Sequence, residues 1–103
     1  FAAFSTTISN GSEGALAVLE RIGVMEKWIE DNADRFTLAT TVQHLREAKD
    51  AGKVAIMMNS QSMDMLDENL AYVQKYWDLG IRQMNFSYNQ TGAYSAGMVA
   101  KPD

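Results

Sequence analysis

The stretch Gly52-Lys53-Val54-Ala55-Ile56-Met57-Met58 decides the fold class of this 103-residue chain. After the glycine and the lysine come five consecutive apolar residues with no polar residue between them. A strand with one face in water alternates apolar and polar residues, whereas a strand of a helix-covered parallel sheet is a continuous apolar run. We therefore predict a buried strand of a parallel sheet over residues 54–59.

The residues before this strand predict a helix that ends near Gly52. Thr40 or Thr41 can cap its start, because a threonine hydroxyl accepts a hydrogen bond from a first-turn N–H. A glycine suits the left-handed backbone that often ends a helix. The apolar residues at helical spacing are Val42, Leu45 and Ala48.

The same helix, glycine and strand pattern occurs a second time. A helix is predicted from about Leu66 to Leu79, and Gly80 leads into a strand over residues 81–87. Gly52 and Gly80 are 28 positions apart. Equal units of this kind build parallel α/β sheets with right-handed connections between the strands.

The first part of the chain completes the expected set of three parallel strands. Residues 1–6 are strand-like, and a turn and capping cluster at 9–12 precedes an amphipathic helix. Its apolar stripe is Ala15, Leu16, Leu19, Ile22, Met25 and Ile29. A complete (β/α)8 barrel needs about 250 residues. We therefore expect residues 1–103 to be a single partial domain of such a barrel, internal to a longer protein.

Composition excludes several classes of function. A net charge of −4 with scattered basic residues disfavours a nucleic-acid partner. Without cysteine there is no disulfide scaffold, and the localisation stays open. No apolar run has the roughly 18–20 residues that span a bilayer. Neither a GxGxxG nor a GxxxxGK[ST] loop follows a predicted strand, which disfavours nucleotide-binding folds.

Functional groups of parallel α/β proteins lie just past the carboxyl ends of the strands. Three polar, uncharged segments occupy these places: 5–7, 59–62 and 87–90. Capping and turn formation account for Thr6, Thr7, Ser60 and Ser62. Gln61, Tyr88 and Asn89 remain the candidate site residues.

Other residues favour structural interpretations. His44 is expected on the surface of the second helix. Asp64, Asp67 and Glu68 could form a cation site, but acids in the first turn of a helix also complement its dipole, and we prefer that interpretation. The seven methionines are spread over strands and helices and are expected to fill the core.

Four stretches together resemble a known family. They are Phe1-Ala2-Ala3-Phe4, Phe36-Thr37-Leu38-Ala39, the run from Ala48 to Ala55, and Leu79-Gly80-Ile81-Arg82-Gln83-Met84-Asn85-Phe86-Ser87-Tyr88-Asn89. In this order and spacing the chain is similar to the membrane (renal-type) dipeptidases. The resemblance covers nearly the whole chain and implies a zinc-dependent hydrolase on a (β/α)8 barrel.

The resemblance also assigns roles to the candidate residues. Gln61 matches the family's glutamate that bridges two zinc ions, but a neutral amide offers one carbonyl ligand and no charge. Tyr88 matches a histidine that contacts the reacting carbonyl, and a phenol can still donate a hydrogen bond to a developing oxyanion. Asn89 matches an asparagine expected to bind substrate. The family's His-x-Asp pair and two later histidines have no counterpart here.

Three functions stay open from the sequence. The first is part of a metallopeptidase that cleaves dipeptides or small amides with water activated by one or two zinc ions. The second is a barrel that lost this chemistry and binds a small ligand or peptide, and the third is a freestanding interaction domain. We expect the chain alone to be catalytically inactive, to bind no zinc, and to self-associate through its open strand edges.

Overall fold

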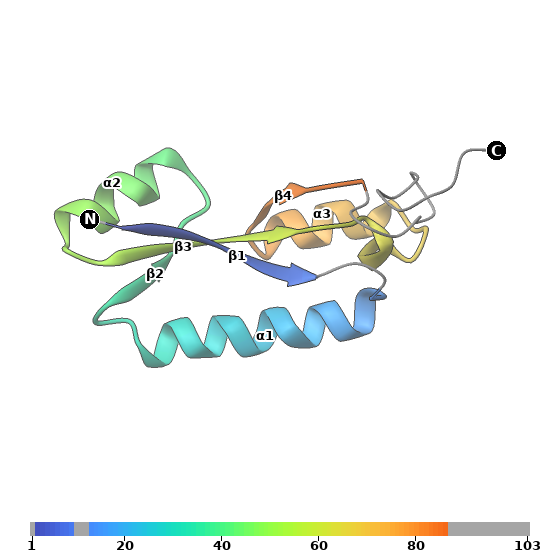
Figure 1. The fold of residues 1–103 in the computed structure, drawn as a ribbon, viewed down its shortest axis with the longest axis horizontal. Coiled ribbons are helices and arrows are strands. Elements are labelled where there is room, and N and C mark those ends of the chain that lie inside the picture. The colour runs from blue at the N-terminus through green and yellow to red at the C-terminus, as the bar shows by residue number, and fades with distance from the viewer. Residues whose placement is uncertain (1, 10–12, 87–103) are drawn as a thin grey trace.

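The computed structural model describes residues 2–9 and 13–86 of the chain. Its elements are, in order, β1 (Ala3–Ser9), α1 (Ala15–Asp31), β2 (Phe36–Leu38), α2 (Val42–Asp50), β3 (Val54–Ser60), the short 3₁₀ helix η1 (Asp64–Leu66), α3 (Ala71–Asp78) and β4 (Ile81–Met84) (Figure 1). Tyr88 and Asn89 lie outside the described residues. Within the described part, no helix has the length and apolar character needed to cross a membrane.

The four strands form one parallel sheet with β3 in the middle. β1 pairs with one edge of β3 along most of its length. The other edge pairs with β2 near its start, where Phe36 lies opposite Val54, and with β4 near its end, where Met84 lies opposite Ser60. The three predicted strands and their parallel pairing are confirmed, and the chain has the α/β fold of part of a (β/α)8 barrel.

The short strand β2 was not predicted. Its three residues, Phe36–Leu38, carry too little pattern to be separated from a loop. β1 also runs on to Ser9, so Thr6 and Thr7 lie inside the strand. The interpretation of these two threonines as helix caps is therefore wrong.

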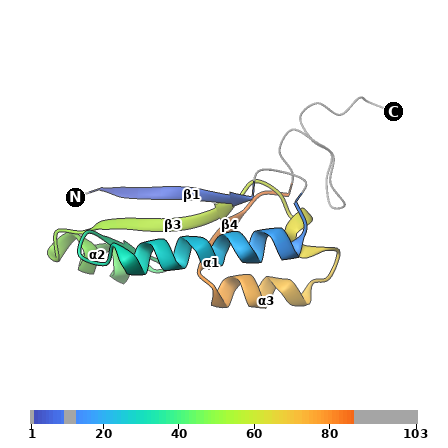
Figure 2. The same cartoon turned by 90° about the horizontal axis from the view of Figure 1, so that it is seen from below.

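The two faces of β3 pack against different helices, because side chains alternate along a strand. Met58 lies in the larger core cluster with Val18 and Ile22 of α1 and with Tyr76 of α3. Its neighbour Met57 packs instead against the small cluster that contains Ala48 of α2. Figure 1 accordingly shows α1 and α2 on opposite sides of the central strand. Figure 2 shows β1 at one edge of the molecule, with β3 between it and the helices.

The first helix follows its predicted stripe in part. Ala15, Ile22 and Ile29 are buried, and Leu19 and Met25 pack against the core. Leu16 is instead 74% exposed, while Val18, absent from the predicted stripe, is fully buried.

The third helix begins later than predicted. Asp67 and Glu68 have left-handed backbone conformations, with φ of 51° and 57°, and interrupt the chain between η1 and α3. The apolar spacing predicts a stripe of Leu66, Leu70, Val73 and Tyr76 or Trp77 on this helix. Leu66, in η1, and Tyr76 are buried, whereas Leu70, Val73 and Trp77 are exposed.

Both glycines predicted to end helices have positive φ, at 69° for Gly52 and 101° for Gly80. Their surroundings differ. A Cβ on Gly52 would meet no atom within 4 Å, while one on Gly80 would lie 3.1 Å from Thr40 and 3.2 Å from Leu38. Gly80 is therefore required by close packing as well as by backbone conformation.

Candidate functional site

The carboxyl ends of β1, β3 and β4 lie at one edge of the sheet, because the strands are parallel and in register near Ser9, Ser60 and Met84. Gln61 follows β3 directly at this edge and is half-buried. Its N–H donates to the carbonyl oxygen of Ser9 at 3.0 Å, and the Asn85 N–H donates to the Ser60 carbonyl at 3.0 Å. Backbone hydrogen bonds to Ser9 at the end of β1 and from Asn85 just after β4 thus fix the backbone at the end of β3.

This segment continues in a buried serine turn. The Ser60 hydroxyl donates to the Ser62 carbonyl at 2.7 Å, and the Asp64 N–H donates to the Ser62 hydroxyl at 3.2 Å. Both serine side chains are buried. Their hydroxyls therefore stabilise the turn, as the sequence predicted, and Gln61 is the side chain of this turn that is left for another role.

Ahead of Gln61, polar side chains form a network between β1 and β3. The Asn59 amide nitrogen Nδ2 donates to the Ser5 hydroxyl at 2.6 Å. The Thr7 hydroxyl donates to the Asn59 Oδ1 at 3.2 Å. Ser5 and Thr7 are exposed and Asn59 is half-buried. The network therefore lies on the accessible surface of the sheet, two residues before Gln61.

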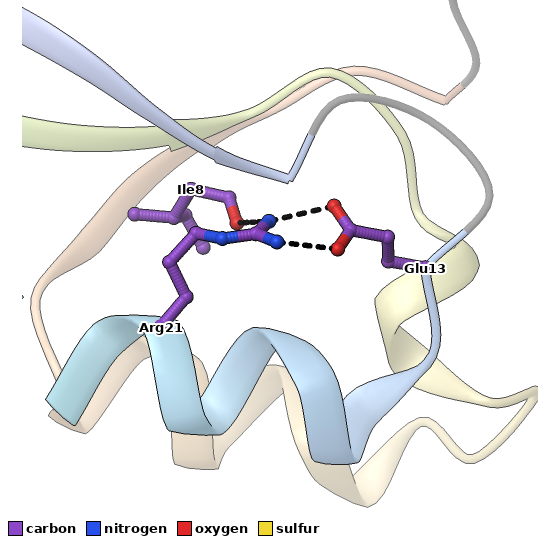
Figure 3. Close-up of polar contacts among 3 residues, drawn as sticks. All are labelled: Ile8, Glu13 and Arg21. Atoms are coloured by element: carbon purple, nitrogen blue, oxygen red, sulfur yellow. Dashed lines mark hydrogen bonds and ion pairs between the residues drawn. The ribbon is translucent and has the colours of Figure 1, made fainter. Parts of the chain in front are cut away.

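An ion pair joins Glu13, just before α1, to Arg21 of α1 (Figure 3). The Arg21 guanidinium of α1 donates to both carboxylate oxygens of Glu13, at 2.6 and 2.5 Å. It also donates to the Ile8 carbonyl near the end of β1 at 2.8 Å. Its hydrogen bond to Glu13 raises the pKa of Arg21. Arg21 therefore joins the end of β1 to the residue just before α1.

Asp67 links the segment after β3 to the start of α1. Its Oδ2 accepts a hydrogen bond from the Ala15 N–H at 3.0 Å, across 52 positions of sequence. The N-cap residue Gly14 provides no side chain to cap α1, and the first turn of α1 has no acid. The preference for a helix-dipole role over a cation site agrees with this contact, but the helix is wrong: Asp67 serves α1, not the helix that follows it.

Tyr76 of α3 stabilises the same segment between β3 and α3. Its ring is buried and its hydroxyl donates to the Met65 carbonyl at 2.7 Å. Burial, and then the charge of Asp67, raise the pKa of Tyr76 to about 12. The phenol therefore stays neutral and acts as a structural donor.

Arg82, in the last of the four family-like stretches, makes structural contacts. Its side chain donates to the carbonyl oxygens of Thr40 at 3.1 Å and Trp77 at 2.7 Å. The guanidinium also lies 3.5 Å from the centre of the Trp77 ring. Arg82 thus joins the loop before α2 to the end of α3.

His44 is half-buried, not the simple surface residue expected. Its Nδ1 accepts from the Thr40 N–H at 3.0 Å, and its own N–H donates to the hydroxyl of the N-cap Thr41. Both contacts belong to the start of α2, far along β3 from Gln61. His44 therefore organises a helix end.

The described residues do not by themselves fit a zinc site. Among residues 2–9 and 13–86, no group of three or more His, Cys, Asp or Glu is placed to hold a metal ion. Gln61 offers one neutral carbonyl, which is a weaker donor for a zinc ion than a carboxylate. The chemistry that this part of the chain can supply is hydrogen bonding from uncharged amides and hydroxyls.

Comparison with known proteins gives a family and a structural neighbour. The pattern of the family described as "Membrane dipeptidase (Peptidase family M19)" matches residues 1–103. An amidohydrolase from Pseudomonas aeruginosa has a similar structure, with a TM-score of 0.92 and 26% sequence identity over 96% of this chain. The match spans 30% of that amidohydrolase. None of the curated proteins matches the chain.

Proposed function

The chain belongs to the membrane dipeptidase family, and on this basis we propose that a protein containing it hydrolyses dipeptides or related small amides. The observation that carries the proposal is the position of Gln61, which is fixed by backbone hydrogen bonds at the edge where three parallel strands end. This is the edge at which barrel enzymes bind their substrates. Tyr88 and Asn89 are then substrate-binding residues, and Gln61 lies at the position of the family's metal-bridging glutamate.

In this reaction the oxygen of water attacks the carbonyl carbon of the amide. The carbon–nitrogen bond then breaks, and the leaving nitrogen takes a proton from the attacking water to become the amine. Gln61 would orient the substrate or the water through its carboxamide, which can both donate and accept. Zinc, which the family resemblance implies, would need ligands from residues beyond those described, so we assign no step to it.

The test is the cleavage of a dipeptide panel by the purified full-length protein, followed by chromatographic detection of the released amino acids. We expect Gln61→Ala to lower kcat/KM by about 100-fold, the usual effect of losing an oriented hydrogen bond in the transition state. The matched control is Gln43→Ala, since Gln43 is exposed on α2 and bonds only Glu47 among the described residues. Absence of protein-dependent cleavage for every dipeptide would refute the proposal.

A second function is favoured by one observation. Gln61 is uncharged at the position where the family resemblance implies a carboxylate, which suits a barrel that binds a small ligand or peptide without cleaving it. Calorimetry separates the two functions. Saturable binding of a dipeptide that is recovered intact after long incubation would favour the binding protein.

A further inference from the structure

Three polar side chains lie side by side on β1 and β3, two of the strands that end at the candidate site. Thr7 of β1 is in register with Asn59 of β3, and Ser5 and Thr7 are both hydrogen-bonded to the Asn59 side chain. Met58 packs in the core with residues of α1 and α3. Because neighbouring residues on a strand point to opposite faces, Asn59 points to the other face of β3. We call Ser5, Thr7 and Asn59 the polar row.

The composition of the polar row is unusual for its place. The interior positions of (β/α)8 barrels are commonly filled by branched apolar residues packed in layers. One step earlier on the same face of β3, Met57 is apolar and packs against Ala48 of α2. Polar groups that become buried without partners are costly. A polar row at this level is therefore better explained by a ligand than by packing.

Among residues 2–9 and 13–86, the hydrogen bonds of Asn59 leave a defined part of its carboxamide available to a ligand. A carboxamide has two N–H donors and an oxygen with two lone pairs. One N–H is donated to Ser5, and one lone pair accepts from Thr7. One donor and one lone pair remain, on a side chain held in place from both ends. A peptide group offers the complementary pair, one carbonyl oxygen and one N–H.

We propose that Asn59, held by Ser5 and Thr7, binds the peptide group of the substrate and sets the preference of the site for amides. This inference rests on the proposed function and names the part of the substrate that is recognised. Ser5, Thr7 and Asn59 carry no charge. They therefore suit the neutral amide of a dipeptide rather than its charged ends. Asn59 is a specificity residue, and Ser5 and Thr7 are positioning residues.

The experiment compares a dipeptide with the ester of the same shape, in which an oxygen replaces the amide N–H. Both are given to the full-length protein and to its Asn59→Ala and Thr7→Val variants. Loss of one hydrogen bond changes an equilibrium by roughly tenfold or less. We expect Asn59→Ala to reduce the ratio of kcat/KM for amide over ester by about tenfold. Thr7→Val should reduce the same ratio by a smaller factor, through freer rotation of the Asn59 carboxamide.

The matched control is Thr6→Val, the same substitution on the neighbouring residue. Thr6 lines the groove between β1 and α1 and takes part in neither of the two hydrogen bonds to Asn59. This variant should keep the wild-type ratio. A purely structural role for Asn59 would lower both activities together, so an unchanged ratio in correctly folded Asn59→Ala and Thr7→Val overturns the proposal.

Failure of the proposed function is distinguishable from failure of this inference. If the protein cleaves neither compound, the hydrolase proposal fails, and the dissociation constants of the pair are measured by calorimetry. Tighter binding of the amide, lost in Asn59→Ala, would still support amide recognition. Equal or absent binding of the two compounds would overturn it.

Discussion

The contact between Gly14 and Asp67 predicts a specific coupling between two distant residues. A Cβ at position 14 would lie 2.8 Å from the Asp67 Oδ1, closer than real side chains approach. Gly14→Ala must therefore push the carboxylate away and weaken its hydrogen bond to the Ala15 N–H. Gly14 itself has an extended backbone, with φ of −79° and ψ of 179°, which alanine also adopts. Steric conflict is then the main effect of the substitution.

The magnitude follows from the groups involved. Loss of a side-chain cap costs about 0.5–2 kcal/mol, and loss of a carboxylate at a helix start about 0.3–1 kcal/mol. We expect Gly14→Ala and Asp67→Ala each to lower the free energy of unfolding by about 1–2 kcal/mol. In the double variant the added methyl group meets no carboxylate. The decrease in the free energy of unfolding of the double variant should therefore be smaller than the sum of the two single decreases by about 1 kcal/mol.

The assay is urea unfolding of the protein, followed by tryptophan fluorescence. Gly23→Ala is the control, because a Cβ there meets nothing within 4 Å and Gly23 lies inside α1. It should stabilise the protein by up to about 1 kcal/mol, the difference in helix propensity. Strict additivity of Gly14→Ala and Asp67→Ala would refute the proposed contact.

Four further predictions concern stability, ionisation, activity and assembly. Gly80→Ala should destabilise more than Gly52→Ala, which meets only the backbone cost of about 1–2 kcal/mol; equal midpoints in urea would contradict this. The pKa of Tyr76 is raised to about 12. The stabilisation of the folded state by its neutral phenol is therefore complete below about pH 10 and is lost between about pH 10 and 12. Absorbance titration of the protein, compared with Tyr76→Phe, tests this. Residues 1–103 alone should show no dipeptidase activity with added zinc, and a chelator-sensitive rate that scales with protein would contradict this. The same chain should self-associate at low micromolar concentration, whereas light scattering from a compact monomer would show otherwise.

The sequence predicted those parts of the fold that depend on local signals. The run from Val54 to Met58 and the two glycines at 52 and 80 gave the parallel strands and the ends of two helices. The strand β2 was not predicted because three residues are too few to show a two-residue alternation of apolar and polar side chains. The start of α3 was misplaced because apolar spacing continues through Leu66 and Leu70, while the backbone turns at Asp67 and Glu68.

Only the position of the candidate site, at the carboxyl ends of the strands, could be predicted from the sequence. Placing Gln61 at the carboxyl edge needs no more than parallel strands. The polar row was missed because it depends on register, which brings Asn59 beside Thr7 across 52 positions. The cap that Asp67 provides for α1 was missed for the same reason, since no local pattern links residues 15 and 67.

The most direct test of the account is a crystal structure of the full-length protein with a non-cleavable dipeptide analogue. The account predicts the analogue at the carboxyl edge of β1, β3 and β4, with its amide within hydrogen-bond distance of Asn59 and one end next to Gln61. An analogue bound at any other place, with Asn59 and Gln61 untouched, would contradict it.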